Sequence, residues 1–335
     1  MKRLVVMACG LCALMAGVFV QVSVVYAADK VKLPYSPIGW ESLPWYVGKD
    51  GGYYEKYGID AELFFQGASS EIIQAMLAGD AQFAGIGGPA IVSNVIAGGD
   101  VIQVAALVKT FTIPIYAQPS IKTLADLKGQ KVGVSRFGSV THLTALAVLQ
   151  RAGLVKDVTI VQTGGVPESA AAIASGAVAA ATVLPPQSLM LRDKGYRELV
   201  GLKELRELSA FVENGLAVRR SFAAKNPDLV KRFLKASLEG LKRVFDDKNF
   251  AMKSLGQYTK INDPKLLEDS YEWAAAAFVK DPRVPQDAEK ALADKMVELK
   301  MVDAAAAAKT PVTSFFDNQY VDALEKEGFL KKLWP

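Results

Sequence analysis

Short apolar runs alternate with helix-like segments between residues 31 and 184, and this alternation limits the possible folds. Ile59–Phe65 and Val101–Val108 have the β-branched, apolar character of strands, whereas Ser69–Ala78 carries apolar residues at helical spacing. Parallel strands need long crossover connections, which are usually helices. The rhythm therefore predicts an α/β fold in which mostly parallel sheets are flanked by helices.

The other elements are predicted from the same two signals, the spacing of apolar residues and the residues that begin or end each segment. Further strands are expected at residues 31–33, 113–118, 131–135, 158–162 and 180–184. Further helices are expected at residues 45–57, 139–152, 169–175 and from 186 onward. Beyond residue 218 the chain is predicted to be a helical C-terminal region, with helices at 227–245, 264–279 and 285–300 and a helix end in the alanine run 304–308. No low-complexity linker separates two independent domains.

The N-terminus has the pattern of an export signal. Lys2 and Arg3 precede an uncharged run, residues 4–26, that ends in the small residues Ala27 and Ala28. This order predicts a cleaved signal peptide, residues 1–28, and a periplasmic protein. The alternative is a membrane anchor, since the run is long enough to span a bilayer. A lipid anchor at Cys9 is not expected, because too little apolar sequence precedes it.

Composition excludes several kinds of chemistry. The chain has one histidine, His142, and two cysteines, Cys9 and Cys12, both inside the predicted leader. A His/Cys metal site and a Cys/His nucleophilic pair are therefore not expected, and neither is any cofactor. The formal charge of +4, about +2 without the leader, gives no basic stripe for nucleic acid. No GxxxxGK[ST] loop for ATP occurs.

Two segments of the chain follow one plan. Residues 67–86 and 165–183 each contain a glycine, a short polar loop, a helix closed by glycine or a small residue, and a strand of small residues. Two halves of this kind, with helix starts facing a shared crevice, form a ligand-binding geometry. The alternative is that any βα unit shows such a pattern.

Several motifs in this order resemble a known family. They are Pro44-Trp45-Tyr46-Val47-Gly48-Lys49-Asp50-Gly51-Gly52-Tyr53-Tyr54-Glu55-Lys56-Tyr57-Gly58-Ile59-Asp60, Gln74-Ala75-Met76-Leu77-Ala78-Gly79-Asp80-Ala81-Gln82-Phe83, Ile121-Lys122-Thr123-Leu124-Ala125-Asp126-Leu127-Lys128-Gly129-Gln130-Lys131-Val132-Gly133-Val134, Gly138-Ser139 and the segment 180–185. The sequence resembles the nitrate, sulfonate and taurine group of periplasmic solute-binding proteins that serve ABC importers. That group also includes NMT1/THI5-like binding proteins for thiamine-pyrimidine precursors.

The resemblance implies a two-lobed periplasmic-binding-protein type II clamp. Lobe one would comprise residues 29–118 plus 213–335, and lobe two would be the insert 119–212, with a hinge at 115–118 and 211–215. The implied function is capture of a small solute between the lobes and delivery to an ABC permease with its ATPase, by a monomer that is not an enzyme. A sensor built on the same clamp is a second possible function, and an enzyme of the same fold is a third.

The loop between the predicted strand 131–135 and the helix after it is the main candidate ligand site. Backbone N–H groups at a helix start, together with Gly138, Ser139 and Thr141, suit an anionic group, and Arg136 adds a charged fork. The alternative is an ordinary N-cap. The remaining candidates are Ser36, Gly39, Trp40, Gly67, Ser69, Gly88, Pro89, Phe137 and Pro185.

Among these candidates, Trp40 is expected either to stack on the ligand or to pack within its lobe. His142 is expected to be packed or solvent-facing rather than a ligand contact. The predicted ligand is a sulfonate such as taurine or an alkanesulfonate. A thiamine-pyrimidine precursor and a small aromatic acid are the alternatives.

Overall fold

A computed structural model describes residues 27–335 except residue 209. The predicted signal peptide, residues 1–28, and both cysteines therefore lie outside the described residues or at their very start. No helix within the described part of the chain combines the length and the apolar character needed to cross a bilayer.

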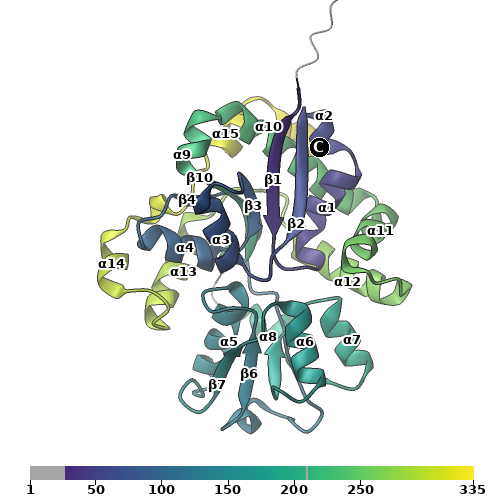
Figure 1. Ribbon diagram of the computed structural model, residues 1–335, viewed down its shortest axis with the longest axis vertical. Coiled ribbons are helices and arrows are strands. Elements are labelled where there is room, and N and C mark those ends of the chain that lie inside the picture. Colours follow the sequence, from purple (N-terminus) through teal and green to yellow (C-terminus); the bar gives the residue numbers. More distant parts are fainter. Residues whose placement is uncertain (1–26, 209) are drawn as a thin grey trace, which may run out of the picture.

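The upper part of Figure 1 is built on a five-stranded sheet, here the sheet of lobe one. Its order is β2-β1-β3-β10-β4, with bounds β1 Asp29–Tyr35, β2 Ile59–Phe65, β3 Phe83–Ile86, β4 Val101–Val108 and β10 Asn214–Arg219. β1 pairs in parallel with β2 and β3, whereas β10 is antiparallel to both β3 and β4. Four strands therefore run in one direction and β10 runs against them.

The lower part, lobe two, repeats this plan. Its sheet has the order β7-β6-β8-β5-β9, with bounds β5 Ile115–Ala117, β6 Lys131–Val134, β7 Thr159–Gln162, β8 Ala180–Thr182 and β9 Arg197–Val200. β5 is antiparallel to β8 and β9, and β6 is parallel to β7 and β8. Each reversed strand is thus the first strand that the chain forms after it crosses between the lobes.

The shared strand order confirms the similarity between the two sequence segments that follow one plan. Residues 67–86 contain α3 (Ser69–Ala78) and β3, and residues 165–183 contain α6 (Val166–Ala174) and β8. β3 and β8 are the third strands of their sheets, next to the reversed strand in each case. The two segments therefore occupy equivalent positions in the two lobes.

The predicted α/β class is confirmed, with two differences in detail. The sheets are mixed, because β5 and β10 are reversed. The expected boundary at residue 118 is also too late, since β5 belongs to the sheet of lobe two. The first crossing is therefore residues 109–114, and the second lies just before β10, which begins at Asn214.

Two groups of helices enclose the sheet of lobe one. α1 (Leu43–Asp50), α2 (Tyr53–Lys56) and α10 (Pro227–Asp246) pack together on one face, where Phe83 of β3 stacks on Phe233 with ring centroids 4.0 Å apart. α3 and α4 (Gly88–Ile96) cover the other face, where Ala84 and Ile86 join a separate buried cluster. Successive side chains of a strand point to opposite faces of the sheet. Phe83 of β3 therefore joins one core, and Ala84 and Ile86 join the other.

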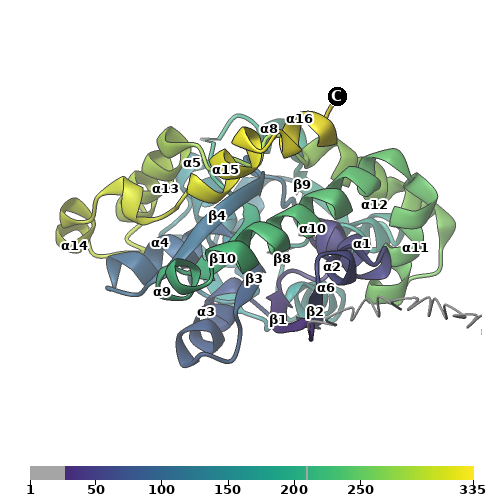
Figure 2. The same cartoon turned by 90° about the horizontal axis from the view of Figure 1, so that it is seen from above.

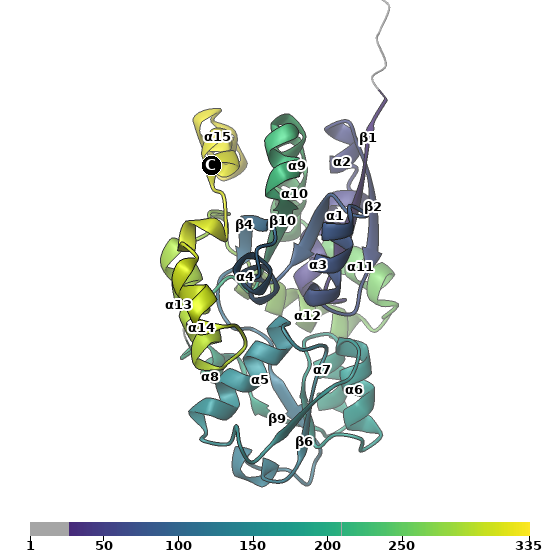
Figure 3. The same cartoon turned by 60° about the vertical axis from the view of Figure 1, so that its left-hand side comes forward.

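The remaining helices surround this frame, and Figures 2 and 3 show their placement. Lobe two is covered by α5 (Val140–Arg151), α6, α7 (Gln187–Asp193) and α8 (Leu202–Leu205). The C-terminal region adds α9 (Arg220–Lys225), α11 (Lys248–Thr259), α12 (Pro264–Ala277), α13 (Gln286–Glu298), α14 (Ala304–Lys309), α15 (Gln319–Lys326) and α16 (Phe329–Leu333). The alanine run is therefore a short helix of its own.

The helix predicted at residues 45–57 is divided into α1 and α2. Gly51 and Gly52 separate them, and Gly52 has φ +70°, in the left-handed region that favours glycine. The bounds predicted for α3, β2 and β4 agree with the structure.

Candidate ligand-binding cleft

Glycines of lobe one lie directly against the backbone of lobe two, so the clamp is closed. A Cβ atom on Gly67 would collide with the carbonyl oxygen of Gly164, and one on Gly39 would lie 2.8 Å from that of Pro185. A Cβ on Gly87 would collide with the side chain of Val140. Three of the predicted ligand positions, Gly39, Gly67 and Pro185, therefore form the contact between the lobes.

These contacts bring four helix N-termini together in pairs. Gly67 and Gly164 lie just before α3 and α6, and Gly87 and Val140 lie at the starts of α4 and α5. All four helices have nine or more residues. The first-turn N–H groups of a helix have no partner within it, and its N-terminus carries partial positive charge. The first turns of α3 and α6 already hold the carboxylates of Glu71 and Glu168, so the starts of α4 and α5 are the ones suited to a negatively charged group.

Three buried hydroxyls fix the loop before α5. The Oγ1 of Thr141 lies 2.8 Å from the Oγ atoms of both Ser135 and Ser139, which are 3.1 Å from each other. Thr141 Oγ1 also accepts a bond from the N–H of Ser135, and Ser139 Oγ donates to the carbonyl of Arg136. Ser139 is the N-cap of α5, as the alternative reading proposed. The hydroxyls hold the loop, and three of its N–H groups are engaged as well: Phe137 donates to Gln162, Gly138 to His142 and Ser139 to the carbonyl of Arg136.

Arg136 joins the two lobes rather than standing free. Its Nε donates to Oε1 of Glu71, in the first turn of α3, over 2.7 Å. Next to it, Gly138 has φ +79° and approaches Ser70 of lobe one, and Phe137 is 49% exposed. Glu71 is thus an interlobe partner as well as an acid in the first turn of α3.

The expectation that Trp40 stacks on a ligand is wrong. Its side chain is fully buried and packs edge-on against Phe278 at 5.4 Å. Trp40 begins the short 3-10 helix η1 (Trp40–Ser42), whose side chains all turn into lobe one. The aromatic ring therefore belongs to the core, which was the other reading of this residue.

The remaining candidates line the same region but are largely covered. Ser36 and Ser69 are buried, and Ser69 Oγ accepts the N–H of Gly87 over 3.3 Å. Gly88 donates its N–H to Val212 in the second crossing, and Pro89 occupies the first turn of α4. These residues shape the lobe-one wall of the cleft.

His142 is packed beside the loop. Its Nδ1 accepts a bond from the N–H of Gly138 over 3.2 Å, and the ring of Phe137 lies 5.0 Å away. Burial lowers the pKa of His142 to about 4. The imidazole is therefore neutral at ordinary pH and positions the loop.

Sequence reasoning missed a buried pair of acids at the hinge. Glu41 in η1 and Glu213 in the second crossing are 1% and 0% exposed. Glu213 accepts bonds from the N–H and the hydroxyl of Thr112 in the first crossing, and Glu41 accepts one from Asn214. Burial raises the pKa of Glu41 to about 8, and burial together with the charge of Glu41 raises that of Glu213 well above its usual range.

The signal that would have found this pair is an isolated acid in an apolar run. Glu41 lies between Trp40 and Leu43, and Glu213 follows Phe211 and Val212. Neither acid has a base at helical spacing that would mark a surface salt bridge.

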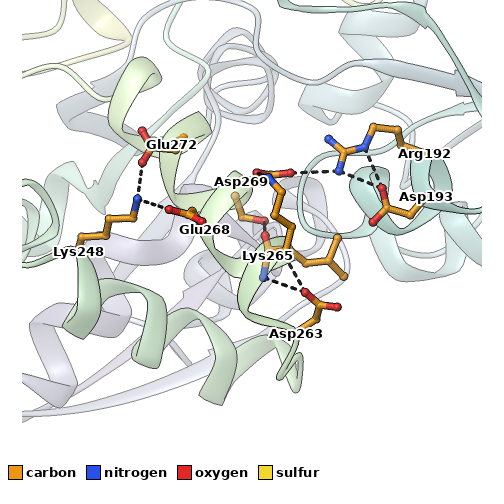
Figure 4. A network of polar contacts seen from close by, with 10 residues as sticks. Arg192, Asp193, Lys248, Asp263, Lys265, Glu268, Asp269 and Glu272 are labelled. Carbon is orange, nitrogen blue, oxygen red and sulfur yellow. Dashed lines mark hydrogen bonds and ion pairs between the residues drawn. The ribbon is translucent and has the colours of Figure 1, made fainter.

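Polar contacts also join the lobes outside the cleft. Arg192 of α7 bonds to Asp269 of α12 over 3.1 Å, and Figure 4 shows this pair within a network on the surface of α12. On the other side, Gln150 of α5 donates to Glu298 of α13 over 2.7 Å. Three separate polar contacts, with Arg136–Glu71, thus hold the closed form.

Comparison with known proteins gives a family and a fold. The family model described as NMT1/THI5 like matches residues 40–250. The riboflavin-binding protein RibY of Chloroflexus aurantiacus is 28% identical over 204 residues, which span 59% of this chain and 57% of RibY. The matched region is therefore less than two thirds of that relative's length.

Solved structures share the fold at lower sequence identity. The alkanesulfonate-binding protein SsuA from Xanthomonas axonopodis pv. citri, bound to MOPS, is similar with a TM-score of 0.71 and 19% identity, over 84% of this chain and 98% of that one. The periplasmic nitrate-binding protein NrtA from Synechocystis is similar with a TM-score of 0.74 and 15% identity, over 92% and 91%. Both likenesses bear on the two-lobed fold alone.

Proposed function

We propose, from the premise that this chain belongs to the NMT1/THI5-like family, that it is an extracytoplasmic solute-binding protein. It closes its two lobes around a small organic solute and presents the solute to the permease of an ABC importer with its ATPase. The predicted export signal and the absence of a His/Cys catalytic set from the sequence support a binding role rather than an enzymatic one. The protein acts in the periplasm as a monomer.

The observation that carries this proposal is the meeting of four helix N-termini across the cleft. The starts of α3 and α6 face each other at Gly67 and Gly164, and those of α4 and α5 face each other at Gly87 and Val140. Backbone N–H groups and helix dipoles bind anions without a dedicated cation. Arg136 is already bonded to Glu71. The N–H groups are thus the main anion-binding element.

The ligand class that fits best is a small organic anion, such as an alkanesulfonate or taurine. Its negative group would contact the first-turn N–H groups of α5, at Val140 and Thr141, beside the loop that contains Gly138 and Ser139. The candidates Ser36, Gly39, Gly67, Ser69, Gly88, Pro89 and Pro185 would enclose the rest of the solute. Phe137 would lie at the entrance, since it is half exposed.

A ligand panel tests the proposal. The mature protein is melted with sulfonates, nitrate, pyrimidines, riboflavin and aromatic acids. A ligand at about 100 times its Kd adds roughly 2.7 kcal/mol to the free energy of unfolding. Sulfonates are expected to raise the melting temperature most. Chemical conversion of any panel member would contradict a purely binding role.

A matched pair of variants locates the ligand. Gly67→Val obstructs only lobe closure, because its new side chain meets Gly164 of lobe two. Ala78→Val changes an exposed position on the same helix, α3. We expect Gly67→Val to abolish the ligand-induced shift while its melting temperature without ligand stays close to that of Ala78→Val. A full shift in Gly67→Val would place the ligand outside the cleft.

A further inference from the structure

Three segments meet at the hinge through buried carboxyl groups. Glu41 lies in η1 of lobe one, Glu213 in the second crossing and Thr112 in the first crossing. Thr112 donates two bonds to Glu213, one from its N–H over 2.6 Å and one from its hydroxyl. Asn214 donates to Oε2 of Glu41 over 3.2 Å. The two crossings and the lobe-one wall are thus tied together at one point.

The pair requires a proton. The carboxyl groups of Glu41 and Glu213 are buried neighbours, since Asn214, the residue after Glu213, donates to Glu41. Oε1 of Glu41 is fully buried and accepts no bond from the described residues. Two carboxylates in contact without a cation repel each other, and one of them binds a proton that both share. A proton between the carboxyl groups satisfies the oxygen that is otherwise without a partner.

The groups around the pair do not supply a compensating charge. From the first crossing comes Thr112, and from β10 comes Asn214, both neutral. η1 contributes Trp40, which faces Phe278 just beyond α12. Lobe two covers the junction with Leu184, Pro185 and Val140, which lie against Gly39 and Gly87. Within the described residues, the charges that act directly on the pair are the two carboxyl groups themselves.

Opening of the hinge would change this environment. Leu184 and Pro185 lie against Gly39, two residues from Glu41, and Val140 lies against Gly87, which also contacts the carbonyl of Glu213. When lobe two moves away, the side chains of Leu184 and Val140 and the carbonyl of Pro185 would leave, and water would reach the junction. Hydrated carboxyl groups ionise at much lower pH than buried ones.

We propose that Glu41 and Glu213 share one proton while the lobes are closed and release it when the hinge opens, so that closure of the clamp is coupled to proton uptake. Closure is then favoured at low pH. Between the pH at which the open pair ionises and the pH at which the closed pair ionises, the closing equilibrium constant falls by up to about tenfold per pH unit.

The experiment measures lobe separation without any ligand, so its result does not depend on the proposed function. Spin labels are placed on Asp80→Cys in lobe one and Lys156→Cys in lobe two, both exposed positions. The protein without residues 1–28 has no other cysteine, since Cys9 and Cys12 lie in the leader. We expect the closed population to fall as the pH rises from 5 to 9.

Two variants separate the pair from the rest of the molecule. The double variant Glu41→Gln/Glu213→Gln removes both titrating groups, so its closed population is expected to be independent of pH. Glu289→Gln is the matched control, because Glu289 in α13 is also buried, with a pKa raised to about 8 by burial alone and no contribution from Glu41 or Glu213. It is expected to keep the wild-type profile.

The outcomes decide the proposal. A flat wild-type profile overturns it, as does a profile of the Glu41→Gln/Glu213→Gln variant with the wild-type slope. Flattening by Glu289→Gln to the same degree also overturns it, because the hinge pair would then have no special part. If the double variant does not fold, Glu41→Gln replaces it; its profile is expected to be shifted along the pH axis, because Glu213 then titrates without a neighbouring carboxyl, and an unshifted profile overturns the proposal.

Discussion

Single buried polar residues determine how this cleft responds to its surroundings. His142 accepts the N–H of Gly138 through its Nδ1, so a neutral imidazole is built into the loop before α5. Protonation would turn that acceptor into a donor and break the bond. The loop therefore keeps its shape only while His142 is uncharged.

We expect His142 to remain neutral throughout the neutral pH range. Its pKa is lowered by burial to about 4, below the ordinary value of about 6.5. The unfolded chain then binds more protons than the folded protein between pH 6.5 and 4, so this residue lowers stability as the pH falls through that window. A proton NMR titration checks this, since His142 is the only histidine. Titration near pH 6.5 would contradict the buried geometry.

The sequence predicted the position of the cleft loop better than the roles of its side chains. Residues 135–141 do lie between a strand and a helix at the lobe interface. Trp40 could not be assigned from sequence, because its burial depends on Phe278, which is far away in the chain. The same holds for Glu41 and Glu213, which are brought together only by the folding of the hinge.

At the level of elements, close helix packing depends on two facing glycines. A Cβ on Gly240 of α10 would lie 2.6 Å from the carbonyl oxygen of Pro44 and 2.9 Å from Cα of Gly48 in α1. The backbones of α1 and α10 are therefore in direct contact. This contact seats both helices on the sheet of lobe one.

Larger residues at Gly240 are expected to force α1 and α10 apart. Gly240→Ala is expected to cost less than Gly240→Leu, which should lower the free energy of unfolding by about 1–3 kcal/mol or more, since overpacking displaces backbone. Urea denaturation measures both. Equal stability of the leucine variant and the wild type would show that the helices can separate without loss.

Two strands that sequence reasoning missed or misplaced depend on distant partners. The strand β10 was not predicted, and β5 was placed in the wrong lobe, because both insert between strands from elsewhere in the chain. The helices α9, α11, α15 and α16 and the strand β9 were also not predicted. Amphipathic segments with local periodicity, such as α3 and α10, were predicted closely.

At the level of the whole molecule, the closed form rests on few and exposed charges. Arg192–Asp269 and Arg136–Glu71 each join the lobes, and all four side chains are between 20% and 44% exposed. Exposed ion pairs contribute little, in the range of 0–1 kcal/mol, and are screened by salt. The clamp can therefore open at small energetic cost.

Removing one of these interlobe ion pairs is expected to change the separation of the lobes more than the free energy of unfolding. Arg192→Gln should change the free energy of unfolding by less than about 1 kcal/mol, while it increases the radius of gyration in X-ray scattering at low salt. Added salt should bring the wild type toward the variant. A variant that scatters like the wild type at every salt concentration would show that Arg192 does not hold the lobes.

The reversed strand β10 has a consequence for the order in which the chain can assemble. β10 lies between β3 and β4, so these two strands have no partner on that side until residues 214–219 arrive. Lobe two, by contrast, is made from one continuous stretch that begins with β5 and ends with β9. Because the chain is synthesised from its N-terminus, lobe two can fold completely before lobe one is complete. The sheet of lobe one therefore stays incomplete between β3 and β4 until all of lobe two has been synthesised.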